Sequence, residues 1–192
     1  MKKLQVLICS GALLAGPALA ADPHAHHHGA DPRVEASRNA VKELQGALVT
    51  ELQAAMKTGG PVNAIEVCHK RAAEIAAGIS AKHGWKVGRT SLKHRNPGSA
   101  PDAWEQKVMQ DFEKRKAAGE DPAKLEHHEI VGKEFRYMKA LPVPADMPCL
   151  KCHGVQLDPA VETRIKTLYP GDKATGYKTG DLRGAVTIRQ PL

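Results

Sequence analysis

The chain has 192 residues, with 28 basic and 21 acidic side chains and a formal net charge of +7. This length suits one domain around one hydrophobic core. The positive excess is modest and scattered, which argues against a nucleic-acid-binding protein. After the N-terminal segment no run approaches the roughly 18 apolar residues of a membrane span, so we expect no transmembrane helix.

The N-terminal segment has the three parts of an export signal. Lys2 and Lys3 form a short basic region, residues 4–14 are apolar, and Ala18-Leu19-Ala20 is a small-x-small cleavage site. We therefore expect a signal peptide over residues 1–20 and a mature protein in the periplasm. Cys9 lies within the apolar run and would be removed with it.

A His-rich tail is expected over residues 21–33. Asp22-Pro23 and Asp31-Pro32 bracket His24, His26, His27 and His28, and the segment has no apolar period. Such a tract either binds Zn, Cu or Ni loosely or is a solvated, disordered segment. We expect a single domain over residues 34–192.

Two helices with apolar stripes are predicted to pack together. The first stripe ends at Gly59-Gly60, and the second begins after Pro61 and ends near Gly84. The stripes consist of Val41, Leu44, Leu48, Leu52 and Ala55, then of Ile65, Cys68, Ala72, Ile75 and Ile79.

The rest of the chain mixes strands and helices. Strands are predicted over residues 85–93, 129–138 and 182–189. A third helix is predicted to start at Ser99 and Pro101 and stop at Gly119. A short helix is predicted to open at Asp121-Pro122, and another at Asp158-Pro159. Helices first, then strands interleaved with helices, indicate an α+β fold with an antiparallel sheet.

Cys149-Leu150-Lys151-Cys152-His153 matches C-x-x-C-H, the attachment signal for c-type haem. Two thiols on one turn of chain can add to the two vinyl groups of the porphyrin, and the adjacent imidazole of His153 can ligate the iron. The motif therefore predicts one covalently bound haem c. A C-x-x-C pair is also found in dithiol-exchange proteins and in half of a zinc site. The zinc alternative needs a second ligand pair at similar spacing, which the sequence lacks.

The second axial ligand decides the chemistry of such a haem. Of four cysteines, one falls in the signal peptide and two in the motif, which leaves Cys68 on the apolar stripe of its helix. Cys68 could be a small buried hydrophobe, an intermolecular disulfide partner or a thiolate ligand. An open position is a further alternative. The other candidates are Met56, Met109, Met138, Met147, His69, His83, His94, His127 and His128.

Five segments in a fixed order carry a family resemblance. The ordered set resembles the Tll-type haem-domain family, single-haem c-type proteins of PAS-like fold, over about residues 35–190. The segments are residues 64–68 (AIEVC), 89–97 (RTSLKHRNP), 101–105 (PDAWE), 149–154 (CLKCHG) and 176–184 (GYKTGDLRG).

The resemblance implies a PAS-like antiparallel sheet with the N-terminal helices packed alongside. It also implies that Cys68 is the axial ligand opposite His153. Two features depart from the family pattern: the His-rich tail, and the lack of the membrane anchor or signalling module that some relatives carry.

A thiolate ligand favours Fe(III), so the haem should have a low potential, and Cys68 could leave on reduction. This suggests a redox sensor or a sensor of diatomic gases such as NO or CO, with a separate redox or signalling protein in the periplasm as its partner. The alternative is a low-potential electron carrier. We expect no enzyme, because two protein ligands leave no free position for peroxidase chemistry. Arg89, Lys93, Arg95, Tyr177 and Arg183 are either propionate contacts or solvated side chains at strand edges.

Overall fold

The computed structural model describes residues 31–192. The predicted signal peptide and most of the His-rich tail lie outside the described residues. The elements are α1 (Pro32–His83), β1 (Lys86–Thr90), the 3₁₀ turn η1 (Pro97–Ser99), α2 (Ala103–Ala117), β2 (Glu126–Val131), β3 (Glu134–Pro142), α3 (Leu150–His153), α4 (Pro159–Leu168) and β4 (Leu182–Pro191).

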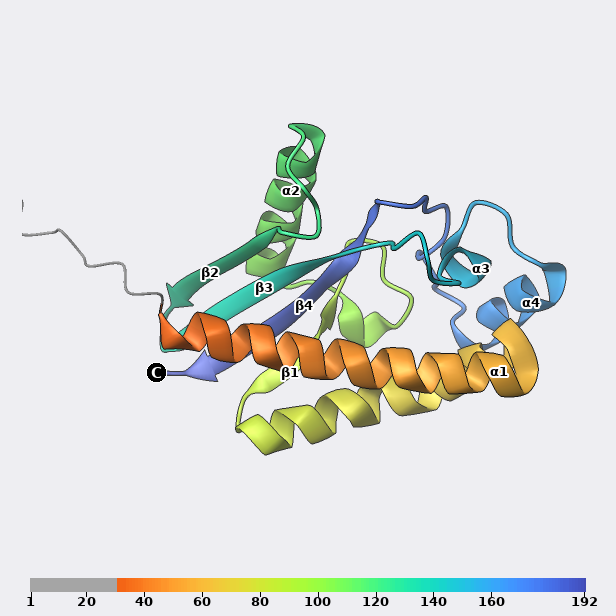
Figure 1. Ribbon diagram of the computed structural model, residues 1–192, viewed down its shortest axis with the longest axis horizontal. Coiled ribbons are helices and arrows are strands. Elements are labelled where there is room, and N and C mark those ends of the chain that lie inside the picture. The colour runs from red at the N-terminus through yellow and green to blue at the C-terminus, as the bar shows by residue number, and fades with distance from the viewer. Residues whose placement is uncertain (1–30) are drawn as a thin grey trace, which may run out of the picture.

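Element α1 consists of two helical arms. The backbone leaves helical geometry at Gly59 and Gly60, and the second arm starts at Pro61 and returns along the first (Figure 1). Lys82 and His83, at the end of the second arm, contact Glu43 on the first at 2.7 and 2.9 Å. The two predicted helices therefore pack together as expected.

The first arm begins earlier than expected. The side chain of Asp31 accepts a hydrogen bond from the amide of Arg33, and Pro32 takes the first helical position. Asp at the N-cap and Pro at the first position are start signals of a helix. Asp31 therefore caps α1, and residues 32–33 belong to the helix and not to the tail.

The sheet has the strand order β1-β4-β3-β2, and every pair is antiparallel. The arms of α1 cover one face, where a core forms around Leu44, Phe135, Tyr137 and Ile188. Helix α2 covers the other face, where its Val108 and Phe112 pack in one cluster with Met138 of β3 (Figure 1). This confirms the α+β class with an antiparallel sheet, and the PAS-like assignment stays a prediction.

Two expectations for the middle of the chain are wrong. Residues 129–138 do not form one strand, because the chain turns at Gly132, whose φ is 61°, and the two sides pair as β2 and β3. Asp121-Pro122 opens a turn and no helix, since the Asp121 side chain accepts from the amide of Ala123. Alternating apolar residues on both sides of a short turn resemble one continuous strand.

Both faces of β3 are buried. Arg136 and Met138 lie under α2 and are 5% and 0% exposed. Within residues 31–192, none of the helices has the length and apolar character needed to cross a bilayer.

Candidate haem site

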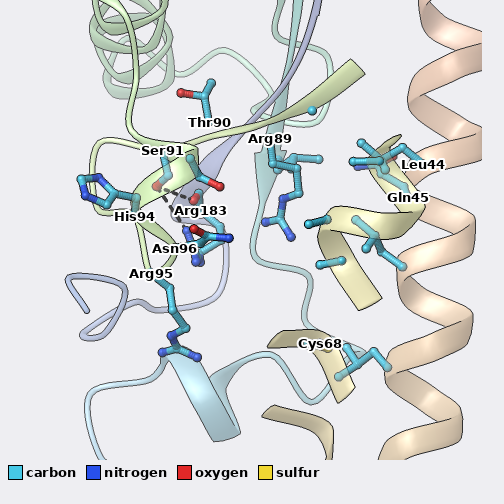
Figure 2. A pocket seen from close by; sticks show the side chains of 18 of the residues that line it. Leu44, Gln45, Cys68, Arg89, Thr90, Ser91, His94, Arg95, Asn96 and Arg183 are labelled. Atoms are coloured by element: carbon cyan, nitrogen blue, oxygen red, sulfur yellow. Dashed lines mark hydrogen bonds between the residues drawn. The ribbon is translucent and has the colours of Figure 1, made fainter. Parts of the chain in front are cut away.

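A cavity of about 1020 Å³ lies between the arms of α1, β1 and the segment around α3. It is at the upper end of the usual range for ligand pockets. The wall from α1 is mostly apolar and includes Leu48, Leu52 and Ala72, whereas the wall from β1 and the following loop is polar. Figure 2 shows this cavity from close by.

The C-x-x-C-H motif forms one wall. Cys149 precedes α3, and the amide of His153 donates to the carbonyl of Cys149 at 2.9 Å, which closes one helical turn. This turn brings Cys149, Cys152 and His153 to the same cavity. The motif therefore has the compact arrangement that two-point attachment and ligation by the adjacent imidazole require.

The imidazole of His153 is oriented by the backbone. Its Nδ1 lies 2.7 Å from the carbonyl oxygen of Ala174, to which it donates, and 3.3 Å from Nε of Arg183. The carbonyl can only accept and Arg183 can only donate, so Nδ1 cannot form a hydrogen bond with both. The shorter contact, with the carbonyl, places the proton on Nδ1 and leaves Nε2 with a free lone pair. A histidine ligand commonly donates its other N–H to a carbonyl in this way. Burial, together with the charges of Arg183 and Arg95, lowers the pKa of His153, so the ring is neutral.

Arg95 braces the motif from behind. Its Nε and Nη2 lie 3.0 and 3.1 Å from the carboxylate of Asp172, and Nη2 also donates to the carbonyl of Cys152 at 2.7 Å. Arg95 was a candidate propionate contact, but Nε and Nη2 of its guanidinium are already hydrogen-bonded to Asp172 and to the carbonyl of Cys152. Asp172 and the Ala174 carbonyl were not predicted, because neither belongs to a recognisable motif.

Lys93 and Tyr177 were also candidate propionate contacts, and neither is among the described residues that line the cavity. Nζ of Lys93 donates to the carbonyl of Thr175 at 2.5 Å and lies 4.5 Å from the centre of the Tyr177 ring. Tyr177 is buried next to Cys149. Both residues therefore support the motif from outside the cavity.

Arg89 and Arg183 do line the cavity. Arg183 donates to Ser91 Oγ at 3.2 Å. The side chain of Arg89 makes no hydrogen bond or ion pair with any residue in 31–192 and projects from β1 toward the space beside α1 (Figure 2). Burial lowers the pKa of Arg89, and burial followed by the charge of Arg89 lowers the pKa of Arg183 to about 10. Two neighbouring guanidinium groups without a carboxylate form a site suited to anions.

Cys68 reaches the same cavity from the second arm of α1, together with Ala64, Ile65 and Ala72 on its stripe. Its thiol is half-buried and unpaired. Burial raises the pKa of Cys68, and the nearby charge of Arg89 acts in the opposite direction. Cys68 is thus placed to ligate a group held by α3.

The structure separates the other ligand candidates. Met56, Met147 and His94 line the cavity, whereas Met109 of α2 and Met138 of β3 are buried where α2 packs on the sheet. The remaining histidine candidates are not among the lining residues and pack against aromatic rings: His69 on Tyr169, which itself lines the cavity, His83 on Trp85, His127 on Trp104 and His128 on Phe135. Only the three-dimensional packing makes this distinction.

Comparison with known proteins agrees with this architecture. The family model described as Tll0287-like matches residues 30–191. The chain belongs to the Tll0287-like family. Its fold is similar to the crystal structure of the cyanobacterial heme-protein Tll0287, with a TM-score of 0.64 and 24% sequence identity over 89% of this chain and 97% of that one. No curated protein matches the chain.

Membership of the Tll0287-like family confirms the resemblance found in the sequence. The residues present also fit a haem. One turn of chain supplies two thiols and a neutral imidazole, and α1 supplies a third thiol to the same cavity. Arg89 and Arg183 supply two guanidinium groups that could bind carboxylates. Within residues 31–192, no group of three or more His, Cys, Asp or Glu side chains is arranged to hold a metal ion.

Proposed function

We propose that this protein binds one haem c through thioether bonds to Cys149 and Cys152, with His153 and Cys68 as axial ligands. We further propose that it acts in the periplasm as a sensor of redox state or of diatomic gases such as NO and CO. The haem would supply a one-electron couple and an iron site for small ligands.

The observation that carries the proposal is the shared cavity. It joins an oriented, neutral His153 on α3 to the unpaired thiol of Cys68 on α1, although the two residues are far apart in sequence. A cavity of about 1020 Å³ with an apolar wall suits a large aromatic macrocycle. The structurally similar Tll0287 is a heme-protein, which supports the same cofactor here.

Cys68 is suited to being a ligand that can be released. Burial favours the protonated thiol, and Arg89 favours the thiolate. A small change in the charge near the sulfur can therefore shift the balance between the two forms. Protonation of Sγ would free Cys68 from the metal and open a position for another ligand, which gives a two-state element.

Arg89 and Arg183 are proposed to hold the propionates. Both line the cavity, and neither side chain forms an ion pair within residues 31–192. A guanidinium group stays protonated in proteins, so both offer a positive charge. Two carboxylates would compensate two guanidinium groups and would orient the macrocycle along β1.

The second candidate is a low-potential electron carrier that docks to a redox partner in the periplasm. The observation in its favour is exposure at the motif itself: Val155, two residues after His153, is 67% exposed, and Lys151 is exposed as well. An apolar side chain and a charge at the attachment turn would suit transient docking.

Absorption and electron paramagnetic resonance spectra of the oxidised protein test the ligation. A low-spin thiolate signature is expected in the wild type and in Met56→Leu, the control from the same cavity wall. Its loss is expected in Cys68→Ala. The proposed ligation is wrong if the wild type lacks the signature or if Cys68→Ala retains it.

Exposure of the reduced protein to CO and NO separates the two functions. Reversible binding with loss of the sulfur ligand supports sensing. Reduction and reoxidation without binding either gas supports electron transfer and rejects the gas sensor.

A further inference from the structure

The three cysteines within residues 31–192 are all unpaired and all line one cavity. Cys149 and Cys152 come from the motif around α3, and Cys68 comes from the second arm of α1. Each is half-buried, so each is shielded from large reagents but accessible from the cavity. A cluster of three thiols has more than one way of forming a disulfide.

The two thiols of the motif belong to different apolar clusters. Cys149 packs with Val143, Ala174 and Tyr177 on the side of the β4 loop. Cys152 packs against a cluster that contains Ile65, Val161 and Ile165, on the side of α1 and α4. The side chains of Cys149 and Cys152 thus have different neighbours.

Cys152 lies on the side of the motif that faces Cys68. Ile65, one of its cluster neighbours, is one helical turn before Cys68 and lines the same cavity. The segments α1, α3 and α4 are in mutual contact there. The packing therefore favours Cys68 as the partner of Cys152.

We propose that in the haem-free chain Cys68 and Cys152 form a reversible disulfide. The oxidant is a protein or small-molecule disulfide. A Cys thiolate attacks one of its sulfurs, and the second Cys resolves the mixed disulfide. One Sγ–Sγ bond forms in the chain, the oxidant's S–S bond is reduced to two thiols, and these take up the two protons. A dithiol reductant reverses the reaction.

The consequence for maturation rests on the function proposed above. Thioether formation adds an S–H bond across a vinyl group without net oxidation, so it requires Cys152 as a free thiol. The disulfide would occupy both the sulfur that attaches the haem and the sulfur that ligates its iron. Reduction would release both together and would thereby control haem attachment.

Peptide mapping of the haem-free chain, residues 21–192, tests the proposal directly. Lys151 lies between Cys149 and Cys152, so trypsin separates all three thiols into peptides 58–70, 140–151 and 152–164. After oxidation by glutathione disulfide, alkylation and digestion, mass spectrometry is expected to find mainly the 58–70 peptide linked to 152–164.

Single substitutions provide the controls. Cys149→Ser is expected to retain the same linkage, and Cys68→Ser is expected to lose it. The proposal is overturned if 140–151 is the main partner of 152–164, if it is the main partner of 58–70, or if the pairings form a mixture. The experiment contains no haem, so its failure leaves axial ligation by Cys68 intact, and failed ligation leaves the disulfide intact.

Discussion

Arg95 and Asp172 form a two-point ion pair, with nitrogen–oxygen distances of 3.0 and 3.1 Å, that joins the loop after β1 to the loop after α4. The same guanidinium binds the carbonyl of Cys152, and Asp172 also accepts from the amide of Ala174 at 2.9 Å. The pair thus positions both the motif and the carbonyl that orients His153.

Removing this pair should destabilise the protein and disorder the site. The Arg95 and Asp172 side chains are only 11% and 9% exposed, and Asp172→Asn would leave a buried guanidinium without its counter-ion. We expect the free energy of unfolding, measured with urea, to fall by about 3 kcal/mol. Lys166→Ala, which removes an exposed pair with Glu162, should change it by less than about 0.5 kcal/mol. Equal losses in the two variants would contradict the bracing role.

A second buried network attaches α2 to the sheet. Nη2 of Arg136 lies 3.2 Å from Glu105, which also accepts from Thr187 Oγ1 at 2.8 Å. Arg136→Met should lower the stability by about 3 kcal/mol because it leaves Glu105 buried with its charge only partly compensated. Thr187→Val should cost about 1.5 kcal/mol, the value of a hydrogen bond to a charged group. Urea unfolding measures the stability of both variants. An Arg136→Met variant as stable as the wild type would show that the network adds no stability.

Gly184 allows β4 to pass close to the end of β1. Its φ is +142°, and a Cβ there would lie 2.3 Å from the carbonyl oxygen of Thr90. Gly184→Ala should cost about 3 kcal/mol or more through backbone strain and this collision. Thermal unfolding should show a large decrease in Tm for Gly184→Ala and little change for Gly171→Ala, where a Cβ meets no atom within 4 Å. A stable Gly184→Ala protein would contradict this.

Stability should decrease in acid partly through Glu126. The hydrogen bond from Arg38 lowers the pKa of Glu126, so this carboxylate contributes stability above its unfolded pKa of about 4.3. That contribution is lost as the pH falls through the lower pKa of the folded state. Urea unfolding between pH 6 and pH 2 should show a shallower pH dependence for Glu126→Gln than for wild type. Glu162→Gln, at an exposed site, should not alter the slope.

Arg89 should influence the haem electrostatically if it binds a propionate. Loss of its positive charge in Arg89→Gln would favour the oxidised haem and lower the reduction potential. A shift on the order of 60 mV would correspond to a tenfold change in the redox equilibrium. Arg89→Lys should retain most of the potential, and Lys151→Gln, an exposed control at the motif, should leave it nearly unchanged. Spectroelectrochemical titration measures all three, and an unchanged Arg89→Gln potential would reject the contact.

Much of the fold followed from local signals. The apolar stripes before and after Gly59-Gly60 predicted the two arms of α1. The third helix was predicted to start at Ser99 and Pro101, whereas α2 starts at Ala103, because the capping box of Asp102 and Glu105 fixes its first turn. The β2–β3 hairpin was missed because Gly132-Lys133 interrupts the alternation of side chains too briefly to be seen in sequence. Burial of Arg136 was also missed, since its counter-ions are on α2 and its cost depends on them.

The sequence by itself determined which functional groups are available for a cofactor. C-x-x-C-H specifies two thiols and an imidazole on one turn, and counting the cysteines left Cys68 unassigned. Only the tertiary structure decided which distant groups meet them. It placed Cys68, Arg89 and Arg183 in the cavity and Lys93 and Tyr177 behind the motif. Periodicity assigns a residue to a face of its own element, whereas packing between elements far apart in sequence determines what that face contacts.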